Sequence, residues 1–248
     1  MYHMKFRNCN VCISPLLAFV EIILIFILVK ATPYILRLNL NFLDHVIISC
    51  LILIFILFSL LAHEYAHLLA AQWMHLPVKK ITVSLFGAVT SMDEEPSSPK
   101  ESFLLYLAGP LINIILGIAF YASCLSFEGN GIFAAVCFFV ATFNGIFSAY
   151  NLLPVIPLDG GFILRSVLWK MSGDWLWSTR ISCYIGTSLP FIFLLTGLIH
   201  MIVHKPIICI AFLVAGLSLV HNSKTACHQV YAAKILGLIK RSNEHEIP

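Results

Sequence analysis

Two histidines and one glutamate lie within the pentad His63-Glu64-Tyr65-Ala66-His67, with the residue types and the spacing of a hydrolytic metal site. Residues four apart on an α-helix lie on the same face about one turn apart, so both imidazoles can reach one cation. Imidazole nitrogens of this kind suit zinc. Glu64 then lies beside the cation, where its carboxylate can take a proton from water instead of serving as a ligand. The pentad therefore predicts His63 and His67 as metal ligands and Glu64 as a catalytic base.

The apolar sequence around the pentad strengthens the metal interpretation. The 17 residues from Val46 to Ala62 carry no charge, and residues 68–74 continue without one. In an ordinary soluble helix, histidines at chance spacing would be an equally good explanation. Each charge at the centre of a bilayer costs about 2.5–3.5 kcal/mol, however, and ionisable residues kept there are usually functional. We therefore expect metal binding inside a membrane-spanning helix.

The composition of the whole chain places these residues in a membrane protein. Of the 248 residues, 60% are hydrophobic and 11% are charged, which excludes an ordinary soluble domain. Apolar runs long enough to span a bilayer lie at about residues 13–29, 46–74, 103–125, 131–153, 181–203 and 206–221. The first run lacks a cleavage site and is interpreted as a retained helix, not a signal peptide. We predict an all-α polytopic fold of about six transmembrane helices, with a short β-hairpin or re-entrant segment near the active site. Residues 1–222 are predicted as the integral membrane domain and residues 223–248 as a short cytoplasmic tail.

The distribution of basic residues predicts the orientation of these helices. With the N-terminus inside, twelve of the 15 Lys and Arg residues fall in inside loops and three in outside loops, which fits the positive-inside rule. We expect a multi-pass protein of the cell membrane with both termini in the cytoplasm. The net charge of +3 is explained by topology, and no nucleic-acid partner is predicted. The eight cysteines, most of them inside predicted spans, are expected to behave as small apolar residues without a disulfide framework.

A catalytic zinc usually has three protein ligands and one open position, so the two histidines require a third ligand. Asp159 is the best candidate among the acidic residues. Pro154 and Pro157 must break the preceding helix, at a depth similar to that of the pentad and toward the cytoplasmic side, and the glycines at 160 and 161 then permit a tight turn. An ordinary surface loop is the alternative, because Pro, Asp and Gly are common turn formers. Together with the pentad the catalytic interpretation is preferred, since non-helical backbone at membrane depth occurs where it lines a protein cavity.

Three motifs, in the same order, resemble those of the site-2 protease family of intramembrane zinc metalloproteases. The pentad is similar to the family's HExxH motif, and residues Ala108 to Asn113 are similar to its AGPxxN segment. Residues Asn151 to Gly161 are similar to its NxxPxxPLDGG signature. The resemblance covers most of residues 45–170. The compact layout, without an inserted PDZ domain or an appended CBS pair, is most similar to the stage IV sporulation protease branch.

The resemblance implies a zinc endopeptidase that cuts a peptide bond in or next to the transmembrane helix of its substrate. Such a substrate is commonly a single-span or membrane-tethered regulator, and regulatory membrane proteins are further partners. By position, His63, His67 and Asp159 would bind one zinc ion per chain, and Glu64 would be the catalytic base. Asn151 would polarise the scissile carbonyl or position the substrate.

Asn113 and the segment Ile81 to Thr90 can each be explained by a function at the catalytic centre or by a structural function. Asn113 is a weaker candidate for the catalytic centre, because a hydrogen bond between helices in lipid explains it equally well. Residues Ile81 to Thr90 contain an alternation of apolar and polar side chains at the strand period, with Gly87 at a turn. A hairpin there can accept an unwound substrate as an added strand, or it can merely cover the metal site.

Two other functions compete with that of a protease. An intramembrane metal or ion transporter would also place histidines and carboxylates in the bilayer. Transporters often show internal repeats or paired broken helices, whereas this sequence shows one broken segment and no convincing repeat. The second alternative is a non-catalytic family member that binds membrane partners, and the intact Glu64 argues against it.

Overall fold

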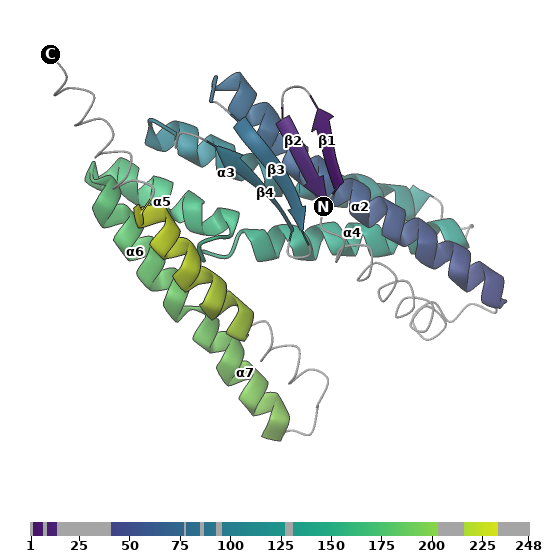
Figure 1. Ribbon diagram of the computed structural model, residues 1–248. Helices are drawn as coiled ribbons and strands as arrows, with labels where there is room; N and C mark the ends of the chain where they lie inside the picture. Colours follow the sequence, from purple (N-terminus) through teal and green to yellow (C-terminus); the bar gives the residue numbers. More distant parts are fainter. Residues whose placement is uncertain are drawn as a thin grey trace, which may run out of the picture. The chain divides into compact units, whose positions relative to one another are not determined.

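The computed structural model describes residues 2–6, 9–13, 41–76, 78–84, 87–92, 96–126, 131–202 and 216–232 (Figure 1). The chain divides into two compact units, Met1–Asn151 and Leu152–Pro248. The candidate residues of the pentad lie in the first unit and Asp159 lies in the second. Each unit is therefore described by itself.

The first unit contains three long helices that contact one another, α2 (Phe42–Trp73), α3 (Pro99–Ser126) and α4 (Gly131–Asn151). Helix α2 begins with a capping box, in which the Asn41 side chain accepts from the backbone of Asp44 and the Asp44 carboxylate accepts from the backbone of Asn41. Its 32 residues span about 48 Å at 1.5 Å per residue, more than the hydrocarbon thickness of a bilayer. All three helices are long and apolar enough to cross a membrane.

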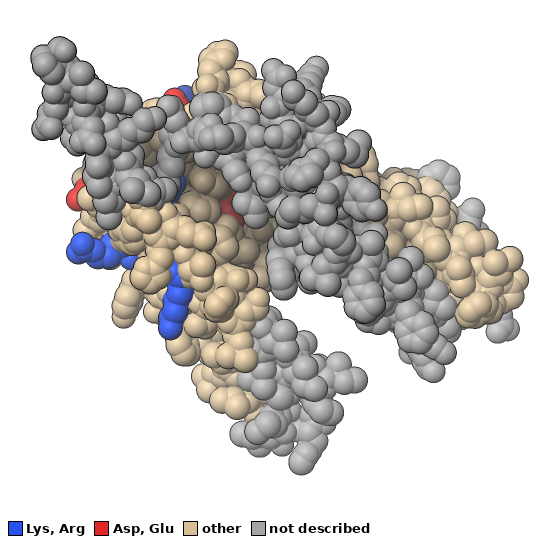
Figure 2. All heavy atoms as spheres, viewed as in Figure 1, with Lys and Arg blue, Asp and Glu red and all other residues tan. Residues whose placement is uncertain are grey.

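The core of the first unit lies between α2 and α4. Ile48 and Ile52, one turn apart on α2, pack against Val136 and Val140 on α4. Phe55 adds an edge-on contact to a phenyl ring of α3, with ring centroids 5.3 Å apart. Apolar side chains are also exposed on these helices, and the described atoms visible in Figure 2 are mostly uncharged. An apolar exterior of this kind suits contact with lipid.

A four-stranded sheet completes the described part of the first unit (Figure 1). Its strands are β1 (Tyr2–Phe6), β2 (Cys9–Ile13), β3 (Val78–Ser84) and β4 (Gly87–Met92), in the order β1-β2-β3-β4. Strands β2 and β3 are parallel, and the other two pairs are antiparallel. The sheet is larger than the single hairpin that the sequence predicts. The signal for β1 was present, because Tyr-His-Met-Lys-Phe alternates apolar and polar residues, although five residues are a short pattern.

The described part of the second unit consists of four helices and a segment of turns over residues 152–158 that precedes the first of them. It contains α5 (Asp159–Ser172), α6 (Trp175–Ser188), α7 (Pro190–Ile202) and a helix over residues 216–232. Asp174 caps α6 by accepting from the backbone N–H of Trp177 at 3.0 Å. Helices α6 and α7 follow each other directly and together form a stretch that can cross a membrane, Trp175–Ile199.

A disulfide between Cys183 and Cys227 joins α6 to the helix over residues 216–232. The prediction of cysteines without disulfides was therefore wrong for this pair. The two residues are 44 positions apart in sequence, and only the packing of the two helices brings their Cα atoms to 5.9 Å, within the usual range for a disulfide. The pair lies in a buried cluster with Ile156. The same helix runs through the predicted boundary between residues 222 and 223.

Four stretches of the described residues are long and apolar enough to span a membrane, and they correspond to the predicted spans 46–74, 103–125, 131–153 and 181–203. Of the other two predicted spans, 13–29 lies outside the described residues except for residue 13, and 206–221 is described only over residues 216–221, which are helical. Four helical stretches of the described part thus have the length and composition that the predicted spans require.

Candidate metal centre

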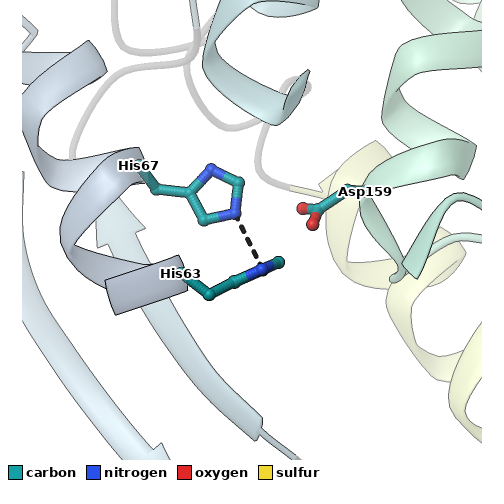
Figure 3. Close-up of side chains that lie close together, drawn as sticks. All are labelled: His63, His67 and Asp159. Atoms are coloured by element: carbon teal, nitrogen blue, oxygen red, sulfur yellow. Dashed lines mark hydrogen bonds between the residues drawn. The ribbon is translucent and has the colours of Figure 1, made fainter. Parts of the chain in front are cut away.

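The pentad lies in the last third of α2, and its three ionisable side chains are buried. His63, Glu64 and His67 are 4%, 8% and 7% exposed. The spacing of four residues places the two imidazoles on one face, with their Nε2 atoms 3.2 Å apart (Figure 3). The rings meet edge to face, with centroids 4.8 Å apart. Both Nε2 atoms are therefore directed at one position.

Gly109 on α3 provides the space that the two rings occupy. A Cβ atom at this position would meet Nε2 of His67, and it would lie 2.6 Å from Cε1 and Nε2 of His63. Real Cβ atoms do not approach other heavy atoms this closely. Any larger residue at position 109 would thus displace the imidazoles or separate α3 from α2. Gly109 belongs to the motif from Ala108 to Asn113, but no spacing in the sequence predicts this role.

Backbone and side-chain acceptors determine where the protons of the two imidazoles lie. Nδ1 of His67 lies 2.8 Å from the carbonyl oxygen of Leu105, and a carbonyl can only accept. Nδ1 of His63 contacts Oδ1 of Asn113, which also accepts. In the neutral form both rings therefore carry their proton on Nδ1, so that both Nε2 atoms present a lone pair.

Two nitrogen lone pairs only 3.2 Å apart repel each other. A cation that binds both Nε2 atoms would remove this repulsion. Nitrogen ligands at about 2.0–2.1 Å from a tetrahedral zinc ion lie about 3.4 Å from each other. The observed separation of 3.2 Å is close to that value. A hydrogen bond between the two atoms would need an additional proton on one imidazole. The donor chemistry and the spacing of these two residues thus fit two ligands of zinc.

The remaining predicted residues of the first unit are also buried. Asn151, the last residue of α4, is 9% exposed, and its amide group donates to the carbonyl oxygen of Phe147 at 3.2 Å. Asn113 is fully buried and bonded on both sides, to His63 and to Asn144. Asn113 thus makes a hydrogen bond between two helices and also contacts a predicted metal ligand. Both predicted roles of Asn113 are compatible with these contacts.

In the second unit Asp159 is the first residue of α5 (Figure 3), and its Oδ2 atom is buried. The preceding segment packs its backbone against the first turn of this helix. A Cβ atom at Gly160 would meet the backbone of Leu152, and one at Gly161 would meet the backbone of Ile156. The two glycines thus permit a closer approach than any other residue would, which positions Asp159 at the end of a tightly packed segment.

Arg165 is a buried cation that sequence analysis counted among the basic residues of inside loops. It lies within α5 and is fully buried, with its guanidinium carbon 5.0 Å from the ring centroid of Phe162 and 5.2 Å from that of Trp175. Contacts of this kind with aromatic faces stabilise a desolvated cation. In this position, between the apolar stretches Gly131–Asn151 and Trp175–Ile199, it also takes part in the packing of α5 on α6.

Comparisons with known proteins identify the family of this chain. The family model described as peptidase family M50 matches residues 51–137 and 128–196. The chain is 38% identical over 124 residues to a Mycobacterium tuberculosis protein named Rip3, which covers 49% of this chain and 32% of that protein. It is 34% identical over 164 residues to "Zinc metalloprotease MJ0392" of Methanocaldococcus jannaschii, covering 66% of this chain and 47% of that protein. It is 32% identical over 116 residues to "Stage IV sporulation protein FB" of Bacillus subtilis, covering 46% and 38%.

The chain thus spans about a third to a half of the length of the curated relatives it matches. Its structure is similar to that of "Site-2 Protease from Methanocaldococcus jannaschii", with a TM-score of 0.58 and 24% identity, over 91% of this chain and 95% of that chain. This likeness shows a shared fold. The family match includes the pentad, the segment before Asp159 and more than half of the 248 residues. The protein is a membrane protein that belongs to peptidase family M50.

Proposed function

We propose that the protein is an intramembrane zinc endopeptidase that hydrolyses a peptide bond in or near the transmembrane segment of a membrane-tethered protein. The observation that carries this proposal is the pair of Nε2 lone pairs from His63 and His67, directed at one position beside Glu64 in an apolar helix. Membership of peptidase family M50 supports the reaction class. The names of its relatives support the metal.

The ligands of zinc in this proposal are His63, His67 and Asp159. Two nitrogen donors and one carboxylate form a donor set that is typical of catalytic zinc. The burial of the Asp159 Oδ2 atom supports its part, because a buried carboxylate oxygen is stabilised by a nearby cation. When bound, zinc supplies Lewis acidity that polarises a peptide carbonyl and makes water more acidic.

Glu64 acts as the general base and then as the general acid. Its position next to His63 on the same helix supports this role, because a carboxylate beside the metal can take a proton from the attacking water. It then delivers that proton to the nitrogen of the departing amine. The buried amide of Asn151 stabilises the carbonyl oxygen as negative charge develops on it, or holds the substrate in register.

Strand β4 is the element that we propose to receive the substrate. Among the described strands β4 has a neighbour on one side only, β3, and an edge strand can pair with an added segment. A substrate helix must unwind before its peptide carbonyls become accessible, and pairing with β4 would hold the unwound backbone. The alternative is that the hairpin β3–β4 only covers the metal site. In that case cleavage would not depend on pairing of the substrate with β4.

The remaining details of the proposal concern the membrane. We propose six transmembrane helices within residues 1–222, a short cytoplasmic segment over 223–248, both termini in the cytoplasm and the site toward the cytoplasmic face of the cell membrane. The four apolar stretches and the distribution of basic residues support this topology. Regulatory membrane proteins and the lipid bilayer are the further partners, and nucleic acid is not a partner.

The decisive experiment compares the parent protein with Glu64→Gln in liposomes that contain zinc and a candidate single-span substrate. We expect the parent to cleave and Glu64→Gln to bind zinc but to lose about 10²–10⁴-fold in rate, the usual contribution of general acid–base catalysis. Tyr65→Phe, an exposed exchange in the same pentad, is the matched control and should cleave like the parent. Unchanged cleavage by Glu64→Gln, or metal flux without cleavage by the parent, would reject the proposal in favour of another role.

A further inference from the structure

We propose that Asn144 is a positioning residue that sets the tautomer of His63 through Asn113. In this inference, which rests on the proposed function for its metal, a polar network across three helices keeps the proton of His63 on Nδ1. The network comprises Ser59 on α2, Asn113 on α3 and Asn144 on α4. Asn144 touches neither imidazole directly, so it acts only through its neighbours.

The direction of the network is fixed at its far end, where the partners cannot change roles. The Asn144 amide nitrogen lies 2.9 Å from the backbone carbonyl oxygen of Val140, and a carbonyl can only accept. It also lies 2.9 Å from Oγ of Ser59, whose hydroxyl donates to the carbonyl oxygen of Phe55. Both hydrogens of the Asn144 amide are thus used on this side. Its oxygen must therefore be directed away from Val140.

The orientation of Asn144 determines that of Asn113. Oδ1 of Asn144 accepts from the amide nitrogen of Asn113 at 2.8 Å. Asn113 must therefore present its oxygen to Nδ1 of His63, and His63 must donate. If the Asn113 amide were reversed, its NH2 group would face Nδ1, and the proton of His63 would move to Nε2. His63 could then no longer bind a cation at Nε2.

Burial of the three side chains makes a reversed amide energetically costly. Ser59, Asn113 and Asn144 are each 0% exposed. A reversed amide at this depth would bring two acceptors, or two donors, together without water to compensate. His67 provides the contrast, because its Nδ1 faces the backbone carbonyl of Leu105 directly and needs no intermediate. The network should therefore control His63 and leave His67 unaffected.

The first test reads the tautomers directly, by ¹⁵N NMR of histidine-labelled full-length protein in its zinc-free form, with His63 assigned by its absence from His63→Ala. The parent should show both His63 and His67 with the proton on Nδ1. Asn144→Leu should shift His63 toward the Nε2–H tautomer and leave His67 unchanged. Ser59→Ala removes one of the two acceptors of the Asn144 amide and leaves Val140 as the other, so it should shift His63 less than Asn144→Leu does. Retention of the Nδ1–H form of His63 in Asn144→Leu would overturn the proposal.

The second test measures zinc affinity by competition with a chelator. Loss of a partner that orients a metal-binding histidine lowers affinity about 10–100-fold, and we expect a loss in this range for Asn144→Leu. In the double variant Asn113→Asp/Asn144→Leu, the carboxylate offers an acceptor to His63 in either orientation, so affinity should return toward that of the parent. A purely structural role for Asn144 predicts no such recovery, and a missing recovery would contradict the inference.

The controls separate this inference from the proposed function. If the parent itself does not bind zinc, the proposed function fails, while the tautomer measurement still tests the network. If the parent binds zinc and Asn144→Leu binds it equally well, the network proposal fails and the proposed function stands. Should Asn144→Leu fail to fold in a thermal unfolding assay, the smaller Asn144→Ala replaces it with the same expected shift of His63. If the zinc affinity of Ser59→Ala were as low as that of Asn144→Leu, the network would have a structural role only.

Discussion

The two segments that carry the proposed ligands are held in place by different kinds of interaction. His63 and His67 are held by hydrogen bonds at Nδ1, to a side chain and to a backbone carbonyl. Asp159 begins a helix without a side-chain cap, and the close backbone contacts of Gly160 and Gly161 position that helix. The chemistry of the ligands explains this difference. An imidazole has two tautomers and needs a partner that selects one, whereas a carboxylate needs only to be placed.

The largest effect is expected when an added methyl group displaces the two histidines. Gly109→Ala places a methyl group against both imidazoles, and misplacement of a reacting group by about 1 Å costs about 10²-fold in rate. We expect Gly109→Ala to lose zinc binding together with at least about this factor in cleavage. The measurements are zinc content and cleavage rate.

Gly117→Ala on the same helix is the matched control, because a Cβ atom there has ordinary contacts, the nearest at 3.5 Å. It should behave like the parent. If Gly109→Ala kept its zinc and its rate, the close contact with α3 would have no part in positioning the two histidines.

A smaller effect is expected when the close backbone contacts that position the start of α5 are disrupted. Gly160→Ala forces the first turn of α5 away from the backbone of Leu152 and should lower the free energy of unfolding by up to about 3 kcal/mol, as overpacking typically does. The measurement is thermal or denaturant unfolding in detergent. Gly145→Ala, where nothing lies within 4 Å, should leave stability nearly unchanged. Equal stabilities for the two variants would show that backbone contact does not hold the segment before Asp159.

The smallest effect is expected for the disulfide that links α6 to the helix over residues 216–232. Cys227→Ser should lower the free energy of unfolding by about 2 kcal/mol, at the low end of the usual range, because the unfolded chain in a membrane is already restrained. The comparison is with Cys50→Ser, which removes a free cysteine and should have no such effect. Labelling of thiols with and without reductant checks the bond itself, and complete labelling before reduction would contradict it.

Local patterns predicted the long apolar helices and the pentad, whereas the helix α5 and the contacts between distant residues escaped prediction. The apolar run 46–74 specifies α2, and the spacing of His63 and His67 specifies their common face, because both depend on one helix. The network of Ser59, Asn113 and Asn144 joins three helices over separations of 31 and 85 residues, and no spacing rule applies to such pairs.

The same limit explains the disulfide and the sheet. Cys183 and Cys227 become neighbours only when their helices pack, and apolar surroundings suggested buried thiols instead. Strand β2 pairs in parallel with β3, about 70 residues away, so neither segment alone indicates its partner. The burial of Arg165 escaped prediction for a related reason, since Trp175, one of the two aromatic rings near its guanidinium, lies on the next helix.

The length of α5 has a consequence for the biogenesis of the protein. Its 14 residues span about 21 Å, less than the hydrocarbon thickness, and it carries a buried guanidinium. On its own such a segment partitions poorly into lipid, because an unshielded arginine opposes insertion. Trp175 lies on the following helix and faces that guanidinium, so the surroundings of Arg165 are complete only once α6 has been synthesised.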